Sequence, residues 1–101
     1  MATVTSKTLA RTAAATSSAT LYTVPASTTA VVTNIVVTNT AGTSGTFTLL
    51  LDDVSIATTV TVGAYDSTII DLKQVLTTTK TIKGLASAVT INFHISGVEI
   101  V

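Results

Sequence analysis

Short runs in which apolar and polar residues alternate dominate this sequence. Near the end of the chain Val89, Ile91, Phe93 and Ile95 share one parity, and the residues between them are polar. A period of two places every second side chain on the same face of a strand. The pattern therefore predicts a half-buried β-strand here, and similar runs extend the prediction to most of the chain.

These other runs have the length of strands, and turn residues separate them. We expect strands at 21–24, 30–40, 46–51, 54–62, 68–72 and 80–85. Together with the final run, seven to eight short strands at a spacing of about ten residues predict a β-sandwich or a small barrel. We favour a single antiparallel β-sandwich of jelly-roll type. The chain has no Trp and no Cys, so the antibody-type immunoglobulin pattern is absent.

The composition fits such a sheet protein and favours contact with other proteins. The chain contains 24 threonines, and only 10% of its 101 residues are charged, with a net charge of zero. Typical soluble domains have about 25% charged residues. A threonine-covered, weakly charged surface is poorly protected against association. It also lacks the basic footprint that nucleic acid or an anionic membrane requires, so we expect neither as a partner.

Residues 1–18 differ from the rest because they are mainly Ala, Thr and Ser. We expect them to form an N-terminal arm or an edge strand, ahead of a sandwich domain at 19–101. A helix around residues 9–15 is the alternative, although no apolar stripe supports it. The segment lacks the continuous apolar core of a secretory signal, and no run of 18 apolar residues predicts a membrane helix.

Three local expectations follow from where the apolar residues lie. In 54–62, Val54, Ile56, Val60 and Val62 should face the core together. The connection at 73–79 should close one end of the core with its two apolar residues, Val75 and Leu76. In the last strand the apolar parity changes after Gly97, so we expect a β-bulge at Ser96–Gly97.

The sequence offers little chemistry, and we expect no catalytic, cofactor-binding or metal-binding residues. The single histidine, His94, lies on the parity opposite to the core set, and a catalytic base needs an oriented nucleophile and partner. No Cys is present, and no Ser lies in a G-x-S-x-G motif. Asp52 and Asp53 are adjacent and favour a tight turn, whereas a calcium site needs six to eight oxygens. We therefore expect no enzyme and no cofactor.

Three lysines and two tyrosines are the remaining polar candidates. Lys73, Lys80 and Lys83 form a weak basic cluster, which we interpret as protection of an exposed strand against edge-to-edge pairing. Tyr22 and Tyr65 are the aromatic residues available for stacking on a sugar, since both Phe are expected in the core. A carbohydrate-binding β-sandwich is therefore a more remote alternative.

Three stretches resemble small structural proteins of tailed-phage virions, and the resemblance covers most of residues 19–101. They are LYTVPA at 21–26, VVTNIVVTNT at 31–40 and ISGVEI at 95–100. The resemblance implies a β-sandwich without enzyme activity that is located in the virion. A protein that cements or decorates the capsid would bind the major capsid protein, usually as a homotrimer. A tail, neck or fibre component is the alternative within the same resemblance.

Overall fold

Residues 3–101 are described by a computed structural model, and they fold into eight β-strands. Met1 and Ala2, which belong to the expected arm, lie outside the described residues. The strands are β1 (Val4–Ala13), β2 (Ala19–Thr23), β3 (Thr29–Asn39), β4 (Gly45–Leu51), β5 (Val54–Val62), β6 (Ser67–Leu76), β7 (Thr81–Ala86) and β8 (Ile91–Ile100). The all-β prediction is confirmed, and residues 3–101 contain no helix that could span a membrane.

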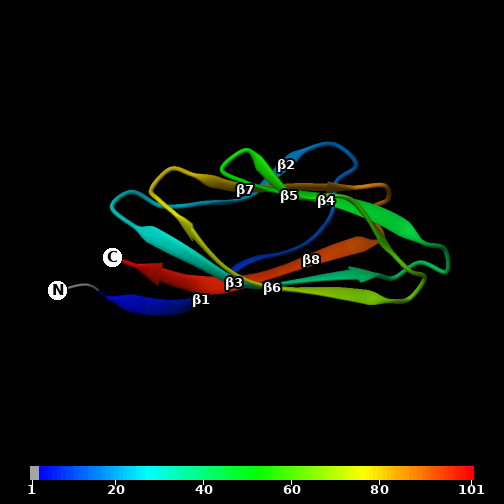
Figure 1. Cartoon of the computed structure of the whole chain (residues 1–101), viewed down its shortest axis with the longest axis horizontal. Coiled ribbons are helices and arrows are strands. Elements are labelled where there is room, and N and C mark those ends of the chain that lie inside the picture. Colours follow the sequence, from blue (N-terminus) through cyan, green and yellow to red (C-terminus); the bar gives the residue numbers. More distant parts are fainter. Residues whose placement is uncertain (1–2) are drawn as a thin grey trace.

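The strands form two four-stranded sheets that pack face to face (Figure 1). One sheet has the order β1-β8-β3-β6 and the other has the order β2-β7-β4-β5. Every pairing is antiparallel. This is the strand order of an eight-stranded jelly roll, so the predicted sandwich of jelly-roll type is confirmed.

The jelly roll can be understood as one long hairpin that is rolled up. Strands β4 and β5 flank its tip, and β3·β6, β2·β7 and β1·β8 are successive pairs along its length. Rolling brings β8 beside β3 and β7 beside β4, which completes the two sheets. The tip is the turn at Asp52–Asp53, where both residues have positive φ values of 54° and 60°. Two such residues make a tight hairpin turn, as their sequence predicts.

The core lies between the sheets and is built from alternate residues of each strand. Phe47 on β4 and Phe93 on β8 meet edge to face, with ring centroids 6.2 Å apart. Ile91 and Ile95 are fully buried, as their parity predicts. Val89 is exposed instead, because the chain is still in a turn there and β8 begins only at Ile91. The expectation that it belongs to the core set is therefore wrong.

Strand β5 breaks the expected period of two. Val54 and Ile56 are 66% and 40% exposed, whereas Ala57 and Val62 are buried. The register between β4 and β5 shifts twice along this pair, and Thr59 has a φ of 48°. The first shift turns Ala57 inward, and the second leaves Ile56 as the extra residue between Ala57 and Ser55. Val54 pairs with the buried Leu51 but is exposed because it lies directly beside the tip turn. The prediction that all four large residues of one parity face the core is wrong for the first two.

The expected bulge in β8 is also wrong, although the register does shift at this level. Alternate burial continues unbroken through Ser96 and Gly97 to Glu99, which faces inward. The extra residues lie in the neighbours, between Thr8 and Ala10 of β1 and between Val32 and Asn34 of β3. A bulge was expected because it would turn the apolar Val98 and Ile100 inward. In the structure the acidic Glu99 faces inward instead, so β8 needs no bulge.

Strand β6 is longer than expected and runs through most of the predicted connection at 73–79. Leu76 is buried and closes the core, as predicted. Val75 is 63% exposed, because it pairs with Val31 on the outer side of the sheet. Its expected role in the core is wrong.

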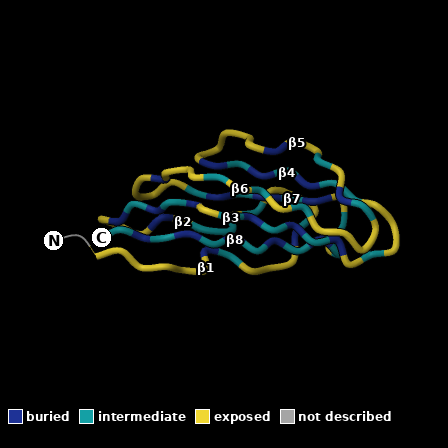
Figure 2. The backbone as a smooth tube through the Cα atoms, turned by 60° about the horizontal axis from the view of Figure 1, so that its bottom comes forward, coloured by how far each residue is buried: buried dark blue, intermediate teal, exposed yellow. Residues whose placement is uncertain are grey.

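Strand β1 forms one edge of its sheet by pairing with β8 of the same chain. Residues 4–13 are extended, so the helical alternative is wrong. Apart from Leu9, which is buried, the strand is largely exposed, as its mostly yellow course in Figure 2 shows. It belongs to the sandwich as the outermost strand of one layer.

Candidate interaction surfaces

His94 lies on the outer face of its sheet, as its parity predicts. It is half-buried and pairs in register with Arg11 on one side and with Val36 on the other. Among residues 3–101 no group of three or more His, Cys, Asp or Glu side chains is placed to hold a metal ion. The histidine is therefore part of a sheet surface in the described structure.

The carboxylates of the tip turn are engaged by lysines from the neighbouring strand region. The Lys83 Nζ lies 2.7 Å from Asp53 Oδ1, and the Lys80 Nζ lies 3.5 Å from Asp52 Oδ1. These pairs are exposed, so each contributes little to stability. The Asp52 N–H also donates to the Thr81 carbonyl at the start of β7 over 2.9 Å. The two acidic residues therefore lie in a turn beside β7, as their sequence predicts.

The expected lysine cluster does not form. Lys73 is on β6, in the other sheet from Lys83. Strand β7 lies between β2 and β4, so Lys83 protects no sheet edge and that interpretation is wrong for it. Lys73 does lie on an edge strand, where a charge disfavours pairing with another chain.

A buried carboxylate that the sequence analysis missed links the two sheets. The Tyr22 hydroxyl on β2 donates a hydrogen bond to Glu99 Oε2 on β8. The Lys7 Nζ on β1 donates to Glu99 Oε1 over 3.2 Å. Glu99 retains only 11% of its side-chain exposure. Unbroken alternation from Ile91 is the signal that places it inward.

This contact shifts the ionisation of both partners. The hydrogen bond from Tyr22, followed by the hydrogen bond and charge of Lys7, holds the pKa of Glu99 below its ordinary value, against the opposing effect of burial. Burial, and then the hydrogen bond and charge of Glu99, raise the pKa of Tyr22. Tyr22 therefore stays neutral and donates the hydrogen bond, and Glu99 stays ionised and accepts it. Tyr22 points inward, so the described aromatic that remains freely exposed for a ligand is Tyr65.

The outer face of the β1-β8-β3-β6 sheet carries a set of β-branched aliphatic side chains. Antiparallel partners lie on the same face, and the neighbours of these residues along each strand point into the core. We call this surface the aliphatic face; its members are Val4, Val31, Val36, Ile69, Val75, Val98 and Ile100. Val4, Ile69 and Val75 are each more than 60% exposed. This density of exposed aliphatic residues on one face marks it as a candidate contact surface.

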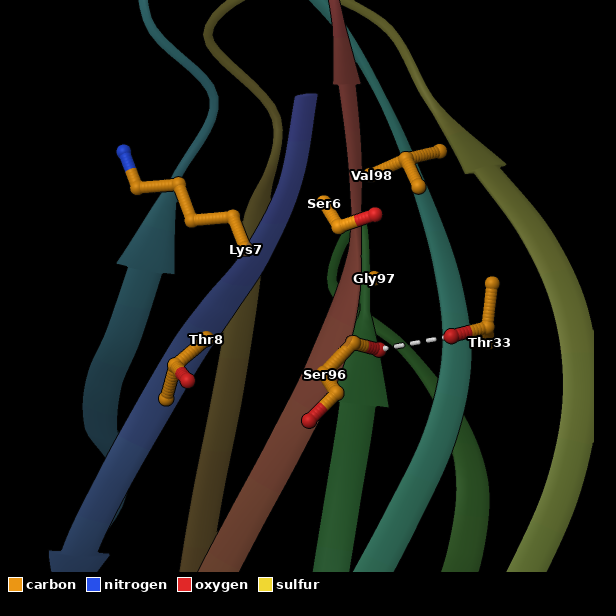
Figure 3. A pocket seen from close by; sticks show the side chains of 7 residues that line it. All are labelled: Ser6, Lys7, Thr8, Thr33, Ser96, Gly97 and Val98. Carbon is orange, nitrogen blue, oxygen red and sulfur yellow. Dashed lines mark hydrogen bonds between the residues drawn. The ribbon is translucent and has the colours of Figure 1, made fainter. Parts of the chain in front are cut away.

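A shallow polar hollow divides the aliphatic face near the register shifts of β1 and β3. Ser6, Thr8, Thr33 and Ser96 line it together with Gly97, and Figure 3 shows the Thr33 hydroxyl bonded to the Ser96 carbonyl. The Lys7 side chain leaves the strand in a different direction from these residues (Figure 3). Hydroxyl groups therefore dominate the lining of the hollow, and Lys7 and Val98 complete it.

The outer face of the β2-β7-β4-β5 sheet has a different chemistry. We call it the threonine face, and its members are Thr20, Thr23, Thr46, Thr48, Thr61 and Thr81. Leu50 and Leu85 lie among them, half-buried. Hydroxyl groups hydrate this face while the methyl groups pack sideways, so it is uncharged apart from Lys83. A shallow hollow bordered by Thr46, Thr48, Thr59 and Leu85 interrupts it.

Comparison with known proteins identifies structures of similar fold but no matching family model. No family model matches the sequence, and no curated protein matches it. The structure resembles a chain in the crystal structure of the infectious bursal disease virus particle, with a TM-score of 0.61 and 10% identity. This likeness covers 98% of the chain and 30% of that viral chain. It supports the jelly-roll architecture.

Two further viral chains are similar at lower scores. A chain of the infectious bursal disease virus Gx strain has a TM-score of 0.45 and 17% identity, over 98% of this chain and 31% of that one. A pentameric capsid protein isolated from metagenomic phage sequences has a TM-score of 0.38 and 12% identity, over 97% of this chain and 59% of that one. The chain thus spans about a third of the length of the two infectious bursal disease virus chains.

Proposed function

We propose that this protein is a non-enzymatic structural component of a virion that decorates or cements a phage capsid. It acts as a homo-oligomer and binds the major capsid protein, which stabilises the shell. The observation that carries the proposal is a jelly roll with two chemically distinct outer faces, one aliphatic with a few charges near its edges and one rich in threonine that is almost uncharged. The likeness of the fold to a chain of an icosahedral virus particle supports it.

The threonine face is the surface that we assign to the capsid. It carries few charges, and its hydroxyl groups can exchange hydrogen bonds with water for hydrogen bonds with a protein partner at small net cost. A surface of this kind fits a partner whose own surface is regular and polar. The tip turn, fixed by Asp53 and Lys83, borders the same sheet and extends the contact.

Residues 1–18 supply a second mode of attachment. As an edge strand, β1 is held by main-chain pairing to β8, by Leu9 and by the Lys7–Glu99 ion pair, and its Ala, Thr and Ser side chains place few demands on a partner. We propose that residues 1–18 act as an element separable from the domain at 19–101. On the virion they add a strand to a neighbouring subunit, through main-chain hydrogen bonds.

The test is to mix the purified protein with capsids that lack it and to measure binding and heat resistance. We expect saturable binding and a higher temperature of DNA release. Thr48→Arg and Thr61→Arg on the threonine face should reduce binding, whereas Thr77→Arg, in the exposed β6–β7 loop, should not. No binding and no gain in heat resistance would refute the cement function. Labelling of the tail alone in electron micrographs would favour the tail, neck or fibre alternative.

A further inference from the structure

The aliphatic face is organised in rows that run across the four strands. Direct pairing aligns Ser6, Val98, Val31 and Val75 in one row, from β1 to β6. A second row, aligned in the same way, contains Arg11, His94, Val36 and Ile69. The polar hollow lies between the two rows, at the level of Thr8, Ser96 and Asp71. Each row is therefore apolar towards β6, and charges of opposite sign lie on opposite edges of the face, with Arg11 on β1 and Asp71 on β6.

We propose that the aliphatic face binds the same face of a second copy of this chain, about a two-fold axis parallel to the strands. Such an axis places β1 opposite β6 of the second copy and β8 opposite β3. Each row of one copy then faces the same row of the second copy, with the order of the four strands reversed. Val31 therefore meets Val98 of the second copy. Sheets that pack face to face with roughly aligned strands, at about 30°, are a common arrangement.

The charges on this face complement one another in that arrangement. Arg11 lies on β1 and Asp71 lies on β6, so they are on opposite edges of one sheet. The two-fold axis brings Arg11 over Ile69 of the second copy, and Asp71 is two residues farther along that strand, about 7 Å away. An arginine side chain spans this distance, so two symmetric Arg11–Asp71 pairs form. Lys73 meets the polar region around Ser6 and Thr8 of the second copy, away from Arg11.

The size of the face matches a stable dimer. Its strands have 10, 10, 11 and 10 residues. Four strands about 4.8 Å apart and about 33 Å long cover roughly 650 Å² per copy. The total of roughly 1,300 Å² falls within the range of specific protein interfaces, about 1,200–2,000 Å². The contact is isologous, so it closes at two copies and leaves both threonine faces free.

This inference concerns the isolated protein and does not depend on the capsid partner. It favours two copies over the three that the resemblance implies. Sedimentation velocity and light scattering should give twice the 10.3 kDa chain mass at micromolar concentration. Arg11→Asp and Asp71→Arg should each raise the dimer dissociation constant by about tenfold or more, because each sets two like charges against each other. The double variant Arg11→Asp/Asp71→Arg should restore the dimer.

The restored dimer of the double variant also controls for folding, since a misfolded single variant cannot be rescued by a second charge change. Thr61→Asp on the threonine face is the matched control and should leave the mass unchanged. A monomer at all concentrations, a trimer, or a dimer that is indifferent to both charge changes would overturn the proposal. A dimer that fails to bind capsids would leave this inference standing and would refute the proposed function alone.

Discussion

Tyr22 and Glu99 join the two sheets of the sandwich through a hydrogen bond between a half-buried phenol and an ionised carboxylate. The residues are 77 positions apart in the chain and belong to different layers. Lys7 on the edge strand β1 completes the contact. One inward acidic residue therefore connects β2, β8 and β1 at the same point of the fold.

Replacing Tyr22 by Phe should destabilise the protein by about 1–3 kcal/mol, the cost of leaving a buried charged group without one hydrogen bond. Chemical denaturation monitored by circular dichroism measures this change in the free energy of unfolding. Tyr65→Phe is the matched control, because that tyrosine is 78% exposed in a loop, and it should have little effect. Equal effects of the two substitutions would contradict the assigned role of the hydrogen bond.

The lowered pKa of Glu99 predicts a loss of stability in acid. A carboxyl whose pKa is lower in the folded state stabilises the fold above its ordinary pKa of 4.5, and this contribution disappears as the pH falls through the folded value. We expect the melting temperature to fall below pH 4.5, and we expect Glu99→Gln to show a shallower fall. Thermal melts of both proteins between pH 7 and pH 3 make the comparison. Parallel curves would show that Glu99 does not carry the dependence.

Gly97 should tolerate no side chain. A Cβ at this position would lie 2.2 Å from the Val31 carbonyl oxygen, which belongs to the backbone of β3 and cannot move without disturbing the sheet. Gly97→Ala should therefore cost about 1–3 kcal/mol or prevent folding. Gly63→Ala is the control, since its nearest contact would be at an ordinary 3.6 Å. A Gly97→Ala protein as stable as the control would mean that β3 and β8 are farther apart than described.

Strand β5 offers a test of its register. Ile56→Thr should change the free energy of unfolding by less than about 1 kcal/mol, because Ile56 is partly exposed. Val62→Thr should cost clearly more, because it places a hydroxyl in the core. Denaturation midpoints of the two variants give the answer. A larger loss for Ile56→Thr would restore the unbroken alternation that the sequence alone predicts.

The sequence by itself determined the class of fold and most of its strands. Local alternation and turn residues are sufficient for this, because each strand and the Asp52–Asp53 hairpin turn depend on neighbours in the chain. The same information placed Ile91, Phe93 and Ile95 in the core and His94 outside it.

Only the tertiary structure decided which residues are displaced from that pattern. The register of β5 depends on how β4 lies beside it, and the extra residues next to Gly97 belong to β1 and β3. Glu99 follows the alternation of β8, whereas the partners that satisfy its buried carboxylate, Tyr22 and Lys7, come from distant parts of the chain. The aliphatic face likewise exists only when four strands are assembled in one order. A period of two describes each strand alone, whereas its partners in the sheet fix its register and the chemistry of the surface it presents.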